Sequence, residues 1–368
     1  MIRFAVIGRN FVTDRMLEAA KYVPELKLSG ICSRSAEGAR EFAQRYGIDA
    51  AHRYVGISKL CKAEDIDAVY IATPNSLHEE QAMHLIGSGK HVFVEKPAAT
   101  SADSFGRMMR AAKNSGVILM EGMMPVHMPG YAVVRRLIKY ITPVRRADLS
   151  YLQYSSRYDK YKSGVIENAF RPELGGGSLM DIGVYCAAFA EGIFGTPRSL
   201  SAEALFLENG IDGEGSAILM YNGMMVGLGY SKITDSAIPS QICGEGGCIS
   251  VDSVSRPRYV TLTLRDGTVR RFDAGRLDLE KYSMMKLDDE ALASIEIDES
   301  GKTPSDDVEV LPDMTHELRR FVHLIERGSL QLAEREQYHT EATLSILDGI
   351  RSCCDIKFES AKRETRLS

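Results

Sequence analysis

Apolar residues fall into short continuous runs separated by longer amphipathic stretches in the first third of the chain. The runs AVYIA and HVFVE contain few polar positions, as is typical of strands buried on both faces. Strands of this kind that alternate with helical stretches predict a parallel sheet. The six strands expected are Ile2–Ile7, Leu26–Cys32, Ala51–Val55, Asp67–Ala72, His91–Glu95 and Val117–Met120.

Three stretches between these strands show helical spacing of apolar residues. Each begins at a polar residue that can cap a helix and ends near a glycine. Six strands joined by right-handed crossovers predict a doubly wound (Rossmann) nucleotide-binding domain over residues 1–121. The helices expected run from Ser35 to Gly47, from Asn75 or Ser76 to Gly89, and from Ser101 to Asn114–Gly116.

Tight turns between strands mark the second part of the chain. Asn222-Gly223 separates the strands Ala217–Tyr221 and Met224–Tyr230. This dipeptide suits a type I′ turn, in which both central residues need positive φ. Such hairpins predict that residues 122–368 form an α+β domain with a large, mostly antiparallel, open-faced sheet, so the fold class is α/β.

Further elements of this second domain follow from the same signals. A second turn is expected at Asp266-Gly267, and the acidic, weakly periodic segment Asp278–Asp307 is expected to be an exposed excursion. The helices expected here are Gly177–Ile193, Thr315–Arg327 and Thr340–Cys354.

Composition is that of an ordinary globular protein. Of 368 residues, 44% are apolar and 26% charged, which excludes disordered and coiled-coil chains. No apolar run approaches the roughly 20 residues that cross a bilayer, and the start MIRFAVIG does not resemble a signal peptide. A net charge of −5 argues against nucleic acid as a partner. We therefore expect a cytoplasmic protein without membrane or nucleic-acid partners.

The cysteines and histidines form no recognisable metal site. Seven cysteines in a chain without an export signal are expected to be reduced thiols. Cys243 and Cys248 lack the spacing of a zinc site, and the eight histidines form no HExxH-like cluster. No metal cofactor is expected.

Gly8 follows the first strand and precedes a helix. A residue without a side chain there lets the backbone approach a pyrophosphate, which the helix amides favour. The loop Gly8-Arg9-Asn10-Phe11-Val12-Thr13 lacks two of the three fingerprint glycines. Taken alone, it fits dinucleotide binding and a plain strand–turn–helix equally well.

Ser33 and Arg34 follow the second expected strand, where NAD enzymes usually carry an acidic residue. A hydroxyl and a guanidinium suit the 2′-phosphate of NADP through charge-assisted hydrogen bonds. NADP is therefore favoured over NAD, although a solvated arginine at a helix start would look the same.

Polar residues also end the fourth and fifth strands. Ligands of such sheets bind at the carboxyl ends of the strands, so these residues are candidates for cofactor binding. Lys96, between an acid and a proline, could polarise a carbonyl or lower the pKa of a neighbouring hydroxyl. The candidates are Thr73, Pro74, Asn75 and His78 after the fourth strand, and Glu95 and Lys96 in Glu95-Lys96-Pro97.

Asp181 and Tyr185 follow the glycine run Gly175–Gly177 and lie four residues apart, on one face of a helix. A carboxylate and a phenol that project together need a polar partner, such as a substrate with several hydroxyls. By themselves they could equally be a helix-start charge and a core residue. Weaker candidates for substrate contact are Arg157, Asn168 and Arg171.

These motifs together resemble the glucose–fructose oxidoreductase, inositol dehydrogenase and rhizopine-catabolism family of NAD(P)-dependent oxidoreductases. The resemblance spans nearly the whole chain and rests on the strand before Gly8, Ala72-Thr73-Pro74-Asn75, Glu95-Lys96-Pro97 and the segment from Gly175 to Tyr185. Tyr185 stands where much of the family has histidine, as in the dihydrodiol dehydrogenase branch.

The resemblance implies a dehydrogenase or reductase acting on a sugar, a cyclic polyol or a related small carbonyl compound. It implies that Tyr185 exchanges the proton, that Lys96 lowers the pKa of Tyr185, and that Asp181 holds the substrate. A homodimer or homotetramer formed through the second sheet is also implied. The alternative is a catalytically silent NADP-binding regulator of the same superfamily.

Overall fold

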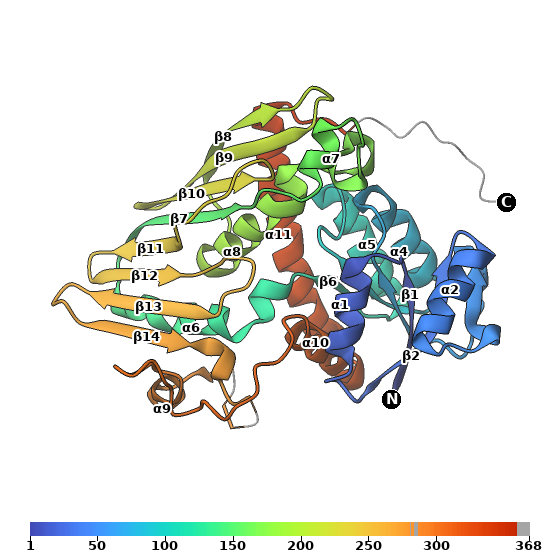
Figure 1. Cartoon of the computed structure of the whole chain (residues 1–368), viewed down its shortest axis with the longest axis horizontal. Helices are drawn as coiled ribbons and strands as arrows, with labels where there is room; N and C mark the ends of the chain where they lie inside the picture. Colours follow the sequence, from blue (N-terminus) through green and yellow to red (C-terminus); the bar gives the residue numbers. More distant parts are fainter. Residues whose placement is uncertain (280, 283–285, 359–368) are drawn as a thin grey trace.

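The computed structural model describes residues 1–279, 281–282 and 286–358, which form two sheets side by side (Figure 1). The first sheet is six-stranded and parallel, in the order β3-β2-β1-β4-β5-β6. This order is that of a doubly wound dinucleotide-binding sheet, as predicted. Its strands are β1 (Ile2–Ile7), β2 (Leu26–Ser33), β3 (Arg53–Val55), β4 (Ala68–Ile71), β5 (His91–Glu95) and β6 (Leu119–Gly122).

Five helices connect these strands, and two are capped as expected. The Ser35 side chain accepts from the amide of Gly38, and the Ser101 side chain accepts from the amide of Ser104. Both helices end at glycines in the left-handed region. The helices are α1 (Phe11–Ala20), α2 (Ala36–Tyr46), α3 (Ile57–Cys61), α4 (His78–Gly87) and α5 (Ala102–Ser115).

Two local predictions in this domain are wrong. The first half of the expected strand Ala51–Val55 is a 3-10 turn, Ala50–His52, and only β3 pairs with β2. The helix expected to be capped by Asn75 or Ser76 begins at His78 after another 3-10 turn, without a side-chain cap. Asn75 is instead free to bond elsewhere.

The second sheet has eight strands in the order β14-β13-β12-β11-β7-β10-β9-β8. All neighbours are antiparallel except β7 and β10, which confirms the mostly antiparallel α+β prediction. The strands are β7 (Val144–Leu152), β8 (Ser199–Phe206), β9 (Asp212–Tyr221), β10 (Met224–Ser231), β11 (Ser240–Gly244), β12 (Gly247–Val251), β13 (Tyr259–Leu264) and β14 (Val269–Asp273).

The β9–β10 hairpin forms where predicted, with Tyr221 opposite Met224. Its turn type is not the expected one, because Gly223 has φ 70° whereas Asn222 does not have positive φ. The Asn222 side chain accepts a hydrogen bond from Arg198 instead.

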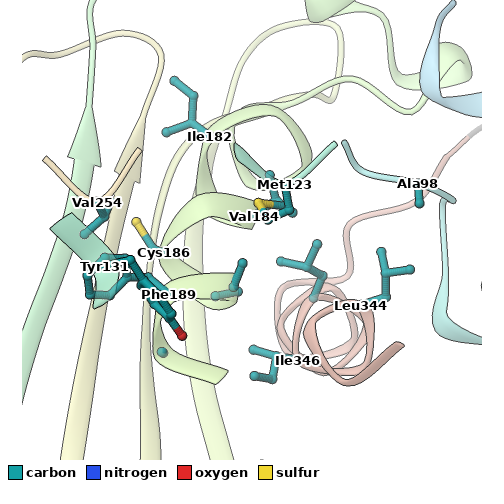
Figure 2. Close-up of a cluster of buried hydrophobic side chains, with 14 of the residues drawn as sticks. Ala98, Met123, Tyr131, Ile182, Val184, Cys186, Phe189, Val254, Leu344 and Ile346 are labelled. Atoms are coloured by element: carbon teal, nitrogen blue, oxygen red, sulfur yellow. The ribbon is translucent and has the colours of Figure 1, made fainter. Parts of the chain in front are cut away.

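One face of the second sheet packs on helices and the other is open. Along β9 the side chains of Ala217 and Leu219 are buried, whereas Ile218 and Met220 are exposed. Figure 2 shows the covered side, where Cys186 and Phe189 lie beside Tyr131 and Val254, with Leu344 and Ile346 of the last helix farther from the sheet. The helices of this half are α6 (Pro129–Leu137), α7 (Tyr158–Lys162), α8 (Val184–Phe194), α9 (Asp289–Ser294), α10 (Thr315–Arg327) and α11 (Leu330–Cys354).

Two expected helices have different starts. The helix predicted over Gly177–Ile193 starts with a π-helical turn, Leu179–Gly183, before α8. The one predicted over Thr340–Cys354 is the last part of α11, which starts at Leu330 and contacts α5, α8 and both sheets.

α10 returns to the first sheet although it follows the second in sequence. Its Phe321 ring stacks on Phe93 of β5 at 5.2 Å, and Leu318 is buried in the same core. The last helices therefore join the two halves of the molecule, and α11 runs between them (Figure 1).

The segment Asp278–Asp307 is only partly the exposed excursion we expected. It contains α9, whose Ala291 and Leu292 are buried together with Ile295. Residues 280 and 283–285 of this segment lie outside the described residues.

Among the described residues, one stretch is long and apolar enough to cross a membrane. This is Pro172–Phe194, and 67% of its most apolar part is buried inside the fold. It includes a π-helical turn and α8, and α8 packs under the second sheet.

All seven cysteines are free thiols in the structure, and Cys243 and Cys248 lie opposite each other with their sulfurs 3.0 Å apart. We expect thiol titration of the denatured protein, purified without oxidant, to approach seven per chain. A count near five would mean that this pair is oxidised, which mass spectrometry of the linked peptide would show.

Candidate functional site

Gly8 lets the chain turn sharply between β1 and α1. It has φ 113°, and a Cβ at this position would lie 2.2 Å from the Ala72 carbonyl oxygen. Any larger residue would push apart the ends of β1 and β4, which are neighbours at the switch point of the sheet. The first glycine of the fingerprint is thus kept where the backbone needs it.

Asn10 replaces the second fingerprint glycine without disrupting the loop. Its side-chain oxygen accepts from the amides of Val12 and Thr13, and its amide group donates to the Ala72 carbonyl at 2.9 Å. Within the described chain, no hydrogen bond is donated by the backbone amides of Arg9 and Asn10. The loop therefore keeps free donors at a helix N-terminus and fits a pyrophosphate group.

The end of β2 carries the groups expected for the adenosine side of the cofactor. The Arg34 side chain is exposed and makes no ion pair among the described residues. Arg9 lies against the first turn of α2, donating to the Gly38 carbonyl and pairing with Glu41 at 3.3 Å. Arg9 and Arg34 thus place two guanidinium groups near the start of α2, just after the end of β2.

His78 and Asn75 connect loops rather than lining open space. His78 is fully buried, and its two ring nitrogens lie 2.9 Å from the carbonyls of Pro97 and Thr73. This leaves no ring nitrogen for the cofactor contact we expected. Asn75 donates to the Gly175 carbonyl at 2.7 Å and so joins the first sheet to the glycine run.

Glu95 is also buried, and it accepts a hydrogen bond from the Tyr70 hydroxyl at 2.5 Å. Burial raises the pKa of Glu95, while this hydrogen bond and the Lys96 ammonium oppose the rise. Glu95 therefore lies behind Lys96 and supports the end of β5. Thr73 likewise bonds within the loop, donating to Gln81 at 2.8 Å.

Lys96 and Asp181 meet although they are far apart in the sequence. The Lys96 ammonium donates to the Asp181 backbone carbonyl at 2.8 Å and to its carboxylate at 2.9 Å. The same ammonium lies over the Tyr185 ring, 4.8 Å from its centre. The structure thus brings together the three residues that were expected to form the site.

Lys232 is a fourth member of the cluster that sequence reasoning missed. Its ammonium donates to the second carboxylate oxygen of Asp181 at 2.5 Å, and its side chain is only 2% exposed. It also lies over the Phe170 ring at 4.8 Å. The only available signal was a lysine directly after an apolar hairpin strand, which did not distinguish it from a surface lysine.

The charges of this cluster stabilise one another. Burial alone would raise the pKa of Asp181, but the Lys232 and Lys96 ammonium groups outweigh it and hold that pKa well below its usual range. Burial disfavours the charged form of Lys96, yet Asp181 raises the pKa of Lys96 above its usual value. Both groups are therefore ionised at neutral pH.

Burial and the Lys96 ammonium shift the pKa of Tyr185 in opposite directions. Burial raises the pKa of Tyr185 to about 12, and Lys96 lowers it only in part. The lowering of the Tyr185 pKa that was expected from Lys96 is therefore present, but it is smaller than the effect of burial. Tyr185 is a protonated donor at neutral pH.

The local fold explains how Asp181 and Tyr185 reach Lys96. Asp212 is buried and accepts from the Ser178 hydroxyl and the Leu179 amide, which fixes the helix start. Gly177 has φ 112°, and a Cβ there would lie 2.0 Å from the Asp212 carboxylate. The π-helical turn follows at once, a feature that often accompanies functional sites.

The weaker candidates lie at the edge of this cluster. Arg157 pairs with Glu167 at 3.0 Å and lies over the Phe11 ring of the cofactor loop at 5.4 Å. Asn168 is exposed, next to Ala169, while Arg171 pairs with Glu173 and makes no contact with Lys96 or Asp181. Arg157 therefore approaches the cofactor loop, and Arg171 points to a local partner.

Two family models match the chain. Residues 2–123 match the model described as oxidoreductase family, NAD-binding Rossmann fold, and residues 143–250 match the GFO/IDH/MocA C-terminal domain. The chain is thus an oxidoreductase with a dinucleotide-binding domain. It belongs to the GFO/IDH/MocA family, as its motifs indicated.

Named relatives agree with this assignment. Scyllo-inositol 2-dehydrogenase (NADP(+)) IolU of Bacillus subtilis is 46% identical over 267 residues, covering 73% of this chain and 81% of that protein. Trans-1,2-dihydrobenzene-1,2-diol dehydrogenase of Xenopus tropicalis is 31% identical, covering 74% and 81%. The crystal structure of the 3-ketoreductase KijD10 from Actinomadura kijaniata with NADP and TDP-benzene shares the fold, with TM-score 0.77, 22% identity and coverage of 96% and 98%.

Replacing Lys232 with methionine tests the ion network. The substitution leaves Asp181 with one buried ammonium instead of two, so we expect a loss of about 2–4 kcal/mol in the free energy of unfolding. Urea denaturation measures it. The matched control is Lys90→Met, because Lys90 is also buried but its ammonium meets only the Ala63 carbonyl. A loss no greater than that of the control would contradict a role in the network.

Proposed function

We propose that the chain is an NADP-preferring oxidoreductase that interconverts a secondary alcohol of a sugar or cyclic polyol with the corresponding ketone. The observation that carries this proposal is the contact of Lys96 with both Asp181 and Tyr185 at the carboxyl edge of the parallel sheet. A cation, a carboxylate and a phenol placed together there are suited to moving a proton at a substrate oxygen.

The cofactor would lie on the loop from Gly8 to Phe11, with its adenosine end towards Ser33, Arg34 and Arg9. Thr73, Pro74 and Asn75 would border the nicotinamide end, next to Lys96. When bound, the nicotinamide supplies or accepts the hydride. The preference for NADP is supported by the two guanidinium groups and by the cofactor printed in the name of the Bacillus subtilis relative.

In the reduction direction, the Tyr185 hydroxyl donates its proton to the substrate oxygen as a carbonyl becomes an alcohol. The Lys96 ammonium has two of its hydrogen bonds directed to Asp181. Its remaining N–H can stabilise the negative charge that develops on the substrate or phenol oxygen. Asp181 orients Lys96 and offers a carboxylate to a substrate hydroxyl.

Protonation of Tyr185 favours ketone reduction at neutral pH. A pKa raised by burial to about 12 keeps the phenol in its donor form. Alcohol oxidation needs the phenolate, so its rate should increase with pH. Reduction should remain steady over the neutral range.

The substrate class rests on the relatives. Scyllo-inositol, a dihydrobenzene diol and a didehydro-dideoxyglucose appear in the names of relatives. All are ring compounds with neighbouring oxygens, which fits a site with a carboxylate and two ammonium groups. The catalytically silent regulator is the weaker proposal, because it has no need for the Lys96–Asp181–Tyr185 arrangement.

We further propose that residues 1–121 bind the cofactor and that residues 122–368 bind the substrate and form a homodimer or homotetramer through the second sheet. The open face of that sheet supports this, since it exposes large apolar residues. They are Ile218, Met220, Met225, Tyr259 and Val269. A cytoplasmic location is consistent with seven free thiols.

Tyr185→Phe removes the proton donor and leaves the ring. We expect kcat for ketone reduction to fall by about 10² or more, with NADPH affinity unchanged. Steady-state kinetics and fluorescence titration measure the two quantities. The matched control is Tyr151→Phe, because Tyr151 packs edge-on against Tyr185 and its hydroxyl bonds to Gln153.

The same variant tests the pH dependence. Oxidation by the wild-type enzyme should rise with pH towards about 12, and this rise should be absent in Tyr185→Phe. If Tyr185→Phe turned over as fast as the wild type, the Tyr185 hydroxyl would have no part in the mechanism.

Arg34→Ala tests the cofactor preference. Loss of a charge-assisted hydrogen bond should weaken the binding of NADPH by about tenfold or more and leave the binding of NADH nearly unchanged. Arg265→Ala, which removes an exposed arginine on the second sheet, is the control. Equal weakening of both cofactors would contradict a contact with the 2′-phosphate.

Ile218→Glu with Met220→Glu tests the proposed interface. Two charges on the open face should convert the oligomer to monomers in light scattering, because burying an unpaired carboxylate is costly. Met83→Glu, on α4 of the first domain, controls for a charge at an exposed apolar residue. An unchanged mass would place the interface elsewhere.

A further inference from the structure

A large cavity lies at the opposite end of α8 from the cluster of Lys96, Asp181 and Tyr185. It has a volume of about 1730 Å³, and Glu191 and Gly192 from the C-terminal half of α8 are part of its wall. Tyr185 is in the first turn of this helix. Since an eleven-residue helix is roughly 16 Å long, the cavity is distinct from the site described above.

Three helices each present a pair of polar side chains one turn apart to this cavity. Residues four apart share a helix face, so both members of each pair point the same way. One member of each pair is an arginine. The pairs are Tyr131 and Arg135 of α6, His316 and Arg320 of α10, and Arg335 and His339 of α11.

The cavity wall has the opposite charge balance to the chain. Its described residues include twice as many lysines and arginines as acidic residues, whereas the whole chain has 45 basic and 50 acidic residues. A concave wall with an excess of positive charge concentrates anions. We call this cavity the basic cleft.

Two of the three arginines have no counter-ion. Arg320 pairs with Glu336 at 2.6 Å, but Arg135 and Arg335 form no ion pair or hydrogen bond with any described side chain. They belong to different helices, α6 and α11. Two free guanidinium groups on separate walls suit a ligand with more than one anionic oxygen.

Nearby buried polar atoms also lack partners. His316 is 9% exposed, and its Nδ1 has no hydrogen-bond partner among the described residues. In His339 it is Nε2 that has no partner, while Nδ1 bonds to Glu191. Buried polar atoms are usually satisfied by protein, water or ligand. Both atoms are buried behind the wall, so they make its surroundings polar without being exposed to the contents of the cleft.

We propose that the basic cleft binds a phosphorylated small molecule, with Arg135 and Arg335 pairing with its phosphate oxygens. Guanidinium groups match phosphate with paired hydrogen bonds. The concave shape and the net charge of −5 favour a small molecule over nucleic acid. The ligand binds at the same time as the dinucleotide, because the two sites lie at opposite ends of α8.

The test is isothermal titration calorimetry of the full-length protein with inorganic pyrophosphate, with NADPH saturating in cell and syringe. Saturation occupies the cofactor loop, which would otherwise take up the probe. Wild-type protein should bind one pyrophosphate per chain. Arg135→Glu with Arg335→Glu should weaken the binding of pyrophosphate by at least about tenfold, since both positive charges become negative.

The matched control reverses two exposed arginines outside the cleft, Arg265→Glu with Arg327→Glu, and should bind as wild type. Thermal melts show whether each variant is folded, and Arg135→Gln with Arg335→Gln repeats the test with a smaller change. Citrate in place of pyrophosphate distinguishes carboxylates from phosphates.

Three results would overturn the proposal. They are no binding of pyrophosphate by the wild type, equal weakening in the control pair, and tighter binding of citrate than of pyrophosphate. A change of mass in light scattering for the cleft variant, without pyrophosphate binding by the wild type, would mean that the cleft is a contact between chains. None of these results depends on the catalytic role of Tyr185.

Discussion

Asp181 shares its carboxylate between the buried ammonium groups of Lys96 and Lys232, and the rest of the site depends on this pairing. A buried carboxylate needs compensating charge, and a buried lysine needs an anion. Because the three groups come from β5, the π-helical turn and the end of β10, their attraction joins the two sheets. The same contact holds Lys96 over the Tyr185 ring, so the groups that we propose to react are positioned by the interaction that joins the two sheets.

Uncharged contacts reinforce this junction. Asn75 of the first domain donates to the Gly175 carbonyl. His78 bonds to the carbonyls of Thr73 and Pro97 and so connects the loops that follow β4 and β5. α10 and α11 return from the second half of the chain to the first sheet. The molecule therefore consists of two sheets that are held together by helices in contact with both halves.

Sequence patterns predicted the elements that depend on local signals. The continuous apolar strands and the serine-capped helices at Ser35 and Ser101 were correct, because capping and two-sided burial act within a few residues. The π-helical turn at Leu179–Gly183 was missed, since the buried Asp212 fixes that helix start from a strand far away. The direction of the Lys96 effect on the pKa of Tyr185 was expected, but the larger effect of burial was not, because burial is decided by the tertiary structure.

The sequence by itself determined the fold class and the family, through Gly8, Glu95-Lys96-Pro97 and the segment from Gly175 to Tyr185. It also determined which of these residues carry chemical groups able to react. Only the tertiary structure decided that Lys232 joins Asp181 and that Asn75 connects the two domains. It also placed three helices around the basic cleft. The physical reason is that electrostatic pairing and burial depend on distances in space, which residues far apart along the chain acquire only when the two sheets pack together.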